Sequence, residues 1–443
     1  MTPPPVSTGG GVTPTHLIAK CETGGGVKKR SGELAVIILA AGKGTRMRSE
    51  LPKALHKICG RPMLWSLIET VKKFRPKKVV VVAGYGFESL KRAFSREALI
   101  VRQKSLLGSG HAVQQAARHL ENFNGSALVL YCDTPLLSAE VLQSLLDDHK
   151  KHQTDCTLLS VRVLSPEGYG RITKNGSRVE KIVEQMDASA SEKKIREINV
   201  GCYVFDNRKL FGALKKVLKN PKKKEYYLTD TIEILSRKGG QVRAVRSKNL
   251  EETLGINTRH HLAEAQRIMQ EKILKEWIKK GVLIRDPRTT TIDSGVRIGR
   301  DTEILPHTVI ETGCVIGKNC VIGPFARLRG ASKVEDQAVV GNFVEIVRSY
   351  IGHGSQVKHL SYLGDAVVGK SVNIGAGTIT ANYDGKKKQR TVIKDRAQIG
   401  SGTVLIAPVV IGRGAKTGAG SIVTKGKNVP DGRVVAGVPA RLL

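Results

Sequence analysis

The sequence is poor in aromatic residues, paired cysteines and long apolar runs, and each shortage excludes a class of protein. Aromatic residues make up only 4% of the chain, which argues against the stacking surfaces of RNA-binding sheets. No apolar run approaches the ~20 residues of a bilayer-spanning helix. The seven cysteines are scattered, without a CxxC pair or a cluster with histidine. We therefore expect a cytoplasmic protein with reduced thiols and no membrane span.

Acidic residues are also scarce, at 39 against 73 basic ones, which leaves a net charge of +34. Such a field attracts polyanions, so a polyanion-binding scaffold is one interpretation of the chain. The basic runs at 72–78, 222–224 and 386–388 lie in unrelated segments, however, and no helix-turn-helix or zinc-finger motif accompanies them. We favour a basic solvated surface that also suits small anionic substrates, and expect no specific nucleic acid as partner.

The start of the chain has a different composition from the rest. Residues 1–32 are rich in proline, glycine and threonine and lack the apolar stretch of a signal peptide. A segment of this composition cannot bury enough apolar surface to fold by itself. We predict a disordered extension over 1–32.

Aliphatic residues recur at every sixth position in the C-terminal part. Neither a helix nor a simple strand keeps that period, whereas a parallel β-helix does, because three short strands make one coil. The aliphatic side chains then point inward and form one continuous column. A β-sandwich with accidental spacing is the alternative, but it does not explain ten positions in register. These are Ile292, Ile298, Ile304, Ile310, Ile316, Ile322, Leu328, Val334, Val340 and Ile346, and the pattern returns at Val368 and Ile374 and again through Ile393, Ile399, Leu405, Ile411 and Val423.

The N-terminal half alternates apolar strands with helical stretches. The runs at 35–40, 78–83 and 127–131 are typical of buried parallel strands, and helical patterns cover 64–73 and 111–120. This alternation predicts a doubly wound α/β sheet over 33–257, whose ligands bind beyond the carboxyl ends of the strands. A helix over 258–281 with one apolar face joins the sheet to the β-helix over 282–443. A membrane-surface helix is the less favoured interpretation of this linker.

A glycine-rich segment, LAAGKGTRM at 39–47, directly follows the first predicted strand. Small residues let backbone N–H groups close around phosphates, and Arg46 can clamp them. The segment is not a P-loop, because Gly44 separates the lysine from the threonine. It is not a full dinucleotide fingerprint, because Met47 stands where the third glycine belongs. Taken alone, the motif also fits a purely structural tight turn.

Further motifs follow the glycine-rich segment in a fixed order. They are LPK at 51–53, Gln103 with LGSGH at 107–111, LYCD at 130–133, GYGR at 168–171, IVE at 182–184, EIN at 197–199, EYYLTD at 225–230, GIN at 255–257, FVE at 343–345, KHLSYLGD at 358–365, NIGAGT at 373–378 and NYDG at 382–385.

Together these motifs resemble the bacterial bifunctional N-acetylglucosamine-1-phosphate uridyltransferases/glucosamine-1-phosphate acetyltransferases, and the resemblance covers about residues 34–425. It implies a nucleotidyltransferase domain and a left-handed β-helix of hexapeptide repeats, usually trimeric. It also implies UDP-N-acetylglucosamine synthesis, which supplies peptidoglycan, from glucosamine 1-phosphate, acetyl-CoA and UTP.

Nucleotidyl transfer requires a protein to neutralise crowded phosphate charge and to align the reacting groups. Arg46 and Lys53 supply cations, and Asp133 ends the third strand, where a carboxylate can hold Mg²⁺ beside phosphates. By resemblance, Asn257 shares the metal. The resemblance also implies that the nucleotide is bound by Leu39, Ala41, Gly42, Gln103, Gly108, Ser109 and Tyr131, and the amino sugar by Gly170, Glu184 and Asn199.

Acetyl transfer to an amine requires a base that removes a proton from the nucleophile. His359 suits this role, because histidine titrates near neutral pH, and a carboxylate such as Glu345 can hold it. The resemblance implies that Arg329, Tyr362, Asn373 and Lys388 bind the sugar phosphate. It further implies that acetyl-CoA is bound by Ala376, Asn382, Tyr383, Ser401 and Ala419.

Five residues depart from the family pattern, and one of them, Lys358, replaces a small residue beside His359. Val347 stands where a phosphate-binding lysine is expected, and Gly437 where an arginine contacts the coenzyme. Cys132 replaces a glycine and is expected to crowd the nucleotide, whereas Ser109 keeps the hydroxyl of the usual threonine. The two missing cations predict weaker binding, because charge-assisted contacts are worth about 1.5–3 kcal/mol each. The alternative is a single-activity sugar-1-phosphate nucleotidyltransferase whose β-helix serves oligomerisation alone.

Overall fold

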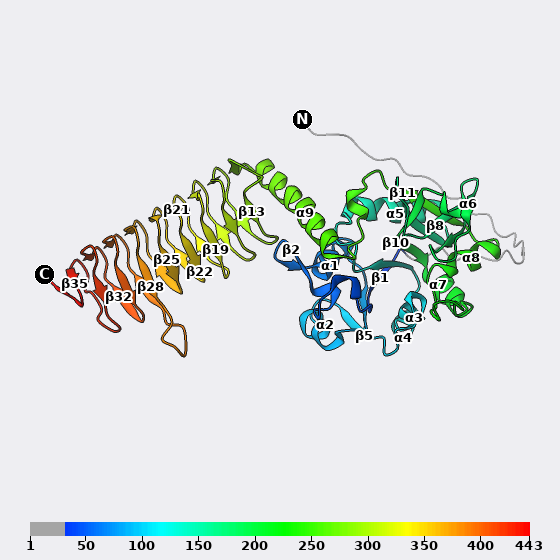
Figure 1. Cartoon of the computed structure of the whole chain (residues 1–443), viewed down its shortest axis with the longest axis horizontal. Coiled ribbons are helices and arrows are strands. Elements are labelled where there is room, and N and C mark those ends of the chain that lie inside the picture. The colour runs from blue at the N-terminus through cyan, green and yellow to red at the C-terminus, as the bar shows by residue number, and fades with distance from the viewer. Residues whose placement is uncertain (1–31) are drawn as a thin grey trace, which may run out of the picture.

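A computed structural model describes residues 32–443, so the predicted extension over 1–32 lies, apart from Gly32, outside the described residues. Two unlike parts follow each other along the long axis, a rounded α/β part and a straight prism (Figure 1). Helix α9 (Arg259–Lys279) connects them.

The α/β part contains eleven strands and eight α-helices among its described residues. The strands are β1 (Leu34–Ala40), β2 (Lys57–Ile58), β3 (Arg61–Pro62), β4 (Lys78–Ala83), β5 (Leu99–Arg102), β6 (Ser126–Tyr131), β7 (Cys156–Arg162), β8 (Arg171–Asn175), β9 (Arg178–Val183), β10 (Glu197–Asp206) and β11 (Val242–Arg246). The helices are α1 (Met63–Lys72), α2 (Phe87–Phe94), α3 (Ser109–Gln114), α4 (Ala117–Leu120), α5 (Ala139–His152), α6 (Ala190–Lys193), α7 (Asn207–Leu214) and α8 (Asp230–Arg237).

One large sheet carries this part, in the order β11-β7-β10-β6-β1-β4-β5. The three predicted strands are β1, β4 and β6, and they run parallel at its centre. β10 runs antiparallel to both β6 and β7, so the sheet is mixed, and the β8–β9 hairpin attaches beside β10. Both faces of β1 are buried, since Ile37 belongs to one apolar cluster and Ile38 to the cluster on the other face. Residues of α1, α2 and α5 cover one face, and residues of α3, α7 and α8 cover the other.

The helix predicted over 111–120 is divided into α3 and α4. The backbone N–H of Gln115 donates to Ala112 O at 3.1 Å, three residues back instead of four. Its side-chain Nε2 donates to His111 O at 3.0 Å and so takes the carbonyl that the next helical turn would use. This local competition between a side chain and the backbone ends α3, which the apolar pattern does not reveal.

The prism consists of three sheets in which each strand is paired in parallel with the equivalent strand one coil further along, except that β36 closes the first sheet antiparallel to β35. One sheet contains β12 (Leu283–Ile284), β15 (Glu303–Ile304), β18 (Val321–Ile322), β21 (Val339–Asn342), β24 (Gln356–His359), β27 (Asn373–Ile374), β30 (Gln398–Ile399), β33 (Lys416–Thr417), β35 (Val434–Gly437) and β36 (Ala440–Leu442). The second contains β13 (Thr291–Ile292), β16 (Val309–Ile310), β19 (Arg327–Arg329), β22 (Glu345–Val347), β25 (Tyr362–Gly364), β28 (Ile379–Ala381), β31 (Val404–Ile406) and β34 (Ile422–Val423). The third contains β14 (Arg297–Ile298), β17 (Val315–Ile316), β20 (Lys333–Val334), β23 (Tyr350–Ile351), β26 (Ala366–Val368), β29 (Thr391–Ile393) and β32 (Val409–Ile411).

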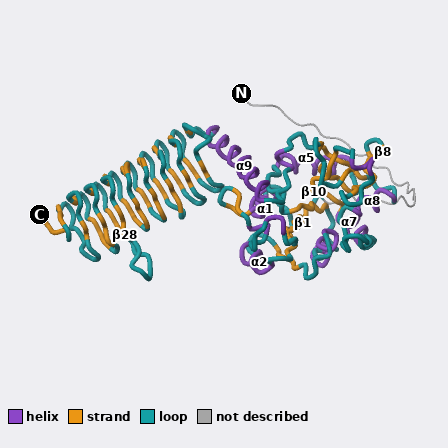
Figure 2. Tube along the Cα trace, in the orientation of Figure 1, coloured by secondary structure: helices purple, strands orange, loops and turns teal. Residues whose placement is uncertain are grey.

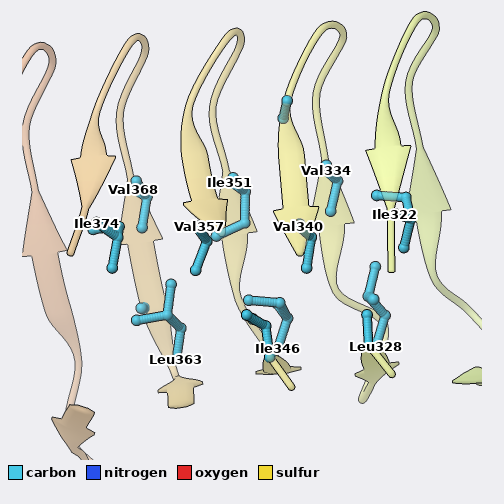
Figure 3. Packing of buried hydrophobic residues seen from close by; sticks show 14 of the residues in the cluster. Ile322, Leu328, Val334, Val340, Ile346, Ile351, Val357, Leu363, Val368 and Ile374 are labelled. Carbon is cyan, nitrogen blue, oxygen red and sulfur yellow. The ribbon is translucent and has the colours of Figure 1, made fainter. Parts of the chain in front are cut away.

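The predicted inward column is confirmed, because each of the ten positions from Ile292 to Ile346 is at most 8% exposed. Ile351, Val357 and Leu363 fill the gap in the pattern and continue the column to Val368 (Figure 3). The gap arises because the coils tighten from 18 residues, as in Ile298↔Ile316, to 17, as in Val334↔Ile351. Each such side chain contributes about 1.5–3 kcal/mol of apolar burial to stability.

Helix α9 packs on both parts of the chain. Ala265 and Ile268 belong to a buried cluster with Ile58 and Met63 of the α/β part, whereas Leu274 belongs to the core of the prism. The apolar face of this helix therefore packs against both parts of the chain.

Candidate active sites

A cavity of about 470 Å³ opens beyond the carboxyl ends of β1 and β6. Its walls include all seven residues predicted to bind the nucleotide, together with Arg46, Lys53, Asp133 and Asn257. Leu106 and Glu225 line it as well and were not predicted. Glu225 belongs to the EYYLTD motif, so its presence in that motif was the available signal. The predicted nucleotide-binding residues therefore converge on one cavity.

Gly42 and Gly44 of the glycine-rich loop differ in what a side chain at each position would contact. Gly44 has φ +64°, and a Cβ there would lie 3.0 Å from Lys53 Cβ, so this glycine is required by the turn itself. A Cβ at Gly42 would meet no atom within 4 Å and is compatible with the local backbone. A structural tight turn therefore accounts for Gly44 only, and the space beside Gly42 belongs to the cavity.

Charged and amide groups converge at the base of this cavity. Lys53 Nζ lies 2.7 Å from Asp133 Oδ2 and 2.9 Å from Asn257 Oδ1, and Arg46 Nη2 donates to the same Asn257 oxygen at 3.0 Å. Carboxylate and amide oxygens are ligands that suit Mg²⁺, which commonly takes its remaining ligands from phosphates and water. The described residues contain no group of three His, Cys, Asp or Glu side chains that could hold a metal. This pair of oxygens thus fits an Mg²⁺ that is shared with a phosphorylated substrate.

The loop that contains Gly108 and Ser109, both predicted to bind the nucleotide, is fixed by contacts within the protein. Gly108 has φ +96°, and a Cβ there would lie 2.6 Å from Tyr226 O. Ser109 Oγ accepts the backbone N–H of Leu228 at 3.0 Å, and Gln103 Nε2 donates to Gly108 O at 3.1 Å. The EYYLTD motif therefore holds this loop in place, which explains why both segments appear in the sequence pattern.

A second cavity of about 210 Å³ adjoins the first and shares Tyr131, Asp133 and Asn257 with it. The three residues predicted to bind the amino sugar, Gly170, Glu184 and Asn199, all line this second cavity. Burial raises the pKa of Glu184, and Thr229 Oγ1 donates a hydrogen bond of 3.1 Å to its carboxylate. The two cavities meet at the charged groups, as a reaction between a nucleotide and a sugar phosphate requires.

Cys132 lies at the edge of the first cavity with only 7% of its surface exposed. Its side chain belongs to the same buried cluster as Leu130 and Leu137, and its backbone N–H donates to Leu39 O at 3.0 Å. Burial raises the pKa of the thiol to about 12, so the group is neutral at pH 7. The side chain is thus largely accommodated by the core, which reduces the expected crowding of the nucleotide.

His359, the predicted general base, and its neighbours on successive coils form one column along a corner of the prism. His359 is in register with Asn342 of the preceding coil. The same backbone bond recurs from coil to coil, with Leu360 N donating to Asn342 O, Gly377 N to His359 O, Gly402 N to Ala376 O and Gly420 N to Ser401 O. With the registers Gln398↔Lys416 and Lys416↔Val434, these bonds give the order Asn342, His359, Ala376, Ser401, Ala419 and Gly437. Three predicted coenzyme-binding residues therefore follow His359 directly.

On each coil, the residue that directly follows the column of His359 also lies at this corner. These residues have large side chains on the coils before His359 and none on the coils after it. His307, Phe325 and Phe343 stack on the preceding coils, with ring centroids 4.6 and 4.8 Å apart. On the following coils the equivalent residues are Gly377, Gly402 and Gly420. The corner is therefore filled by rings before His359 and carries only backbone after it. At ~4.8 Å per coil, the strip of small residues extends about 14 Å, enough for an extended ligand.

Glu345 does not adopt the predicted role beside His359. Its carboxylate accepts Arg329 Nε at 2.6 Å, and its register partner is Tyr362. Arg329, Glu345 and Tyr362 thus lie on adjacent strands of the same sheet, around the corner from His359. Arg329 and Tyr362 were both predicted to bind the sugar phosphate, so Glu345 orients an arginine of that group.

The remaining predicted residues lie at the margins of this face. Asn373 is exposed on β27, and Asn382 Nδ2 donates to Asp365, which Arg348 also holds through bonds of 2.7 and 2.8 Å. Tyr383 and Lys388 pair with each other across the loop that follows β28, which projects from the prism (Figure 2). Within one chain, Lys388 therefore lies on an extension away from the column of His359.

The two departures from the family pattern have different surroundings. Val347 is fully buried and in register with Arg329 and Gly364, so an apolar side chain fills the position where a cation was expected. Gly437 has φ +95° in the turn between β35 and β36 and ends the column of small residues. Neither position offers a replacement cation of its own.

Comparison with known proteins reveals similarity along most of the chain. The family described as MobA-like NTP transferase domain matches residues 36–222, and the family described as bacterial transferase hexapeptide (six repeats) matches 295–330, 313–348 and 390–425. A protein of Geobacillus thermodenitrificans (strain NG80-2) named Bifunctional protein GlmU is 46% identical over 434 residues, with 90% of this chain and 94% of that protein covered. Proteins of the same name from Geobacillus sp. (strain WCH70) and Pelotomaculum thermopropionicum (strain DSM 13744 / JCM 10971 / SI) are 44% and 46% identical, covering 88% and 85% of this chain and 92% and 90% of theirs. No helix among the described residues is long and apolar enough to cross a membrane.

Proposed function

Because the chain belongs to the bifunctional GlmU family, we propose that its two sites carry out successive steps in the synthesis of UDP-N-acetylglucosamine. The prism transfers an acetyl group from acetyl-CoA to glucosamine 1-phosphate. The α/β part then joins N-acetylglucosamine 1-phosphate to UMP from UTP, and pyrophosphate leaves. The observation that carries this proposal is the junction of the two cavities at Asp133 and Asn257, between the nucleotide-binding and sugar-binding residues.

In uridylyl transfer, a phosphate oxygen of the sugar phosphate attacks the α-phosphorus of UTP. Lys53 and Arg46 neutralise the charge that gathers there, and the two cavities hold the reactants in line. Asp133 and Asn257 would hold Mg²⁺, which supplies further charge neutralisation when it is bound. The described protein groups thus act by position and charge, without a covalent intermediate.

In acetyl transfer, the amine of glucosamine 1-phosphate attacks the thioester carbonyl of acetyl-CoA. His359 accepts the proton that the amine loses and returns it to the departing sulfur, so coenzyme A leaves as the free thiol. The strip of Ala376, Ser401 and Ala419 binds the extended arm of the coenzyme, and Arg329 and Tyr362 bind the sugar phosphate. We assign uridylyl transfer to residues 33–257 and acetyl transfer to residues 282–443, joined by the linker helix over 258–281. Assays of both half-reactions on the two separately expressed segments test this assignment.

Replacing Gly42 with alanine tests the nucleotide site. The added methyl group projects into open space beside the loop, so the melting temperature should stay unchanged, whereas the KM for UTP should rise at least about tenfold because a phosphate must approach this backbone. Gly212 in α7 is a matched control, since a Cβ there also meets nothing within 4 Å. Gly212→Ala should leave the KM unchanged. An unchanged KM in Gly42→Ala would contradict the placement of the phosphates.

A homotrimer is the assembly that we propose, with the corner of His359 covered by a second copy. Phe325, Phe343 and Leu360 form an apolar strip beside His359 and are 45%, 55% and 64% exposed in the single chain. Contiguous apolar surface of this kind marks an interface. Sedimentation equilibrium should give the mass of three chains, and Phe343→Asp should lower both the mass and acetyl transfer. A monomeric wild-type protein with full acetyl transfer would contradict the proposal.

We also propose a cytoplasmic location. The six cysteines among the described residues are all free thiols, as expected in a reducing compartment. Cell fractionation measures this directly, and recovery from an oxidising compartment would contradict it.

A further inference from the structure

We infer that Asn342 positions His359 for acetyl transfer, with its side-chain Oδ1 accepting a hydrogen bond from one imidazole N–H. The other ring nitrogen is then left unprotonated and faces the amine. Asn342 is a positioning residue in this scheme, because it acts through His359 and does not contact substrate. The inference rests on the proposed acetyltransferase function of the prism.

The first support is the register of the prism. Asn342 and His359 are paired residues of the adjacent parallel strands β21 and β24, and Leu360 N donates to Asn342 O at 2.9 Å. Residues in register on adjacent parallel strands project to the same side, at the strand spacing of ~4.8 Å. The Asn342 amide is therefore within reach of the imidazole ring through side-chain rotation alone.

The second support is the unsatisfied amide oxygen. Asn342 Oδ1 is buried and has no hydrogen-bond partner among the described residues. Buried acceptors are nearly always paired in folded proteins, because an unpaired one has lost water without replacing it. His359, the register partner of Asn342 on the next coil, carries a ring N–H that would satisfy this oxygen after side-chain rotation.

The third support is that the predicted alternative is already engaged. Glu345 is paired with Arg329 at 2.6 Å and belongs to a strand of the neighbouring sheet. Lys358, next to His359 in sequence, is exposed and can only donate. A neutral amide oxygen is sufficient to fix the tautomer of the ring, because it accepts the N–H of one nitrogen and leaves the other free.

Two substitutions test this role by steady-state acetyl transfer across pH 5.5–9. Asn342→Ala removes the acceptor, so kcat should fall roughly 10- to 100-fold while the KM values for both substrates and uridylyl transfer stay near wild type. Asn342→Asp keeps an acceptor of the same shape, so most of kcat should return. Its added negative charge favours the protonated ring over the neutral one, so the acidic limb of the kcat profile should move to higher pH.

The outcomes separate this inference from the function on which it rests. A wild-type protein without acetyl transfer would overturn the acetyltransferase function and the inference with it. Active wild-type protein together with wild-type kcat in Asn342→Ala would overturn the inference alone. Two other results would show that Asn342 has only a structural role. One is an acidic limb that does not shift in Asn342→Asp. The other is a lowered melting temperature together with loss of uridylyl transfer in both variants.

Discussion

Replacing His359 with alanine is expected to lower acetyl transfer by about 10²–10⁴-fold, the usual contribution of a general base. The amine nucleophile must lose a proton as it attacks, and in the described structure His359 is the titratable group that heads the strip of small residues. Uridylyl transfer should persist at the wild-type rate, because its groups lie on the α/β part. Separate assays of the two half-reactions on one preparation measure both values.

A second histidine of the prism serves as the matched control. His353 is also exposed, but it lies at a different corner, where its carbonyl accepts Ser371 N. His353→Ala should retain both activities. Wild-type acetyl transfer in His359→Ala would show that the base is a different residue, whatever the control does.

Replacing Asp133 with asparagine should reduce uridylyl transfer at least about 100-fold and raise the Mg²⁺ concentration needed for half-maximal rate. The substitution keeps the shape of the side chain but removes the charge that faces Lys53 Nζ at 2.7 Å. Acetyl transfer should stay near normal. Titration of the remaining activity with Mg²⁺ distinguishes a lost metal ligand from a lost fold.

Asp147→Asn on α5 is the matched control for this change. Asp147 is exposed, accepts a hydrogen bond from Gln143 and lines neither cavity. The Asp147→Asn substitution should leave both activities and their Mg²⁺ dependence unchanged. Equal loss of the two activities in Asp133→Asn would indicate a folding defect, and wild-type Mg²⁺ dependence would contradict a metal-binding role.

The prism could be predicted from local pattern because the inward position is set residue by residue. A period of six identifies the column wherever every inward residue is aliphatic, and those positions are buried. The prediction missed Ile351 to Leu363, because 17-residue coils shift the phase. It also missed Thr380 and Thr417, which are buried inward residues with hydroxyls satisfied by neighbouring coils. A count of apolar residues cannot register such positions.

The α/β sheet was only partly predictable, for a different reason. The apolar runs of β1, β4 and β6 are continuous because both faces of the sheet are covered. The antiparallel placement of β10 between β6 and β7 depends on contacts between residues far apart in sequence. No local period encodes that placement, so the mixed character of the sheet appears only in the structure.

The motifs in the sequence brought the predicted site residues of the α/β part together, whereas a relation between stacked coils of the prism could not be predicted. The residues predicted to bind the nucleotide and the sugar line two adjoining cavities. Asn342 lies outside the predicted set because its relation to His359 exists only when two coils are stacked. Glu345 was assigned to His359 on proximity in sequence order, whereas the fold pairs it with Arg329.

The most direct test of the account is an assay of both half-reactions with purified wild-type protein at saturating substrates. We predict acetyl-CoA-dependent conversion of glucosamine 1-phosphate to its N-acetyl form, and UTP-dependent conversion of that product to UDP-N-acetylglucosamine with release of pyrophosphate. The buried Val347 and the Gly437 turn should appear as raised KM values in the first reaction, not as its absence. Uridylyl transfer without any acetyl transfer would contradict the account and leave the prism as an assembly module.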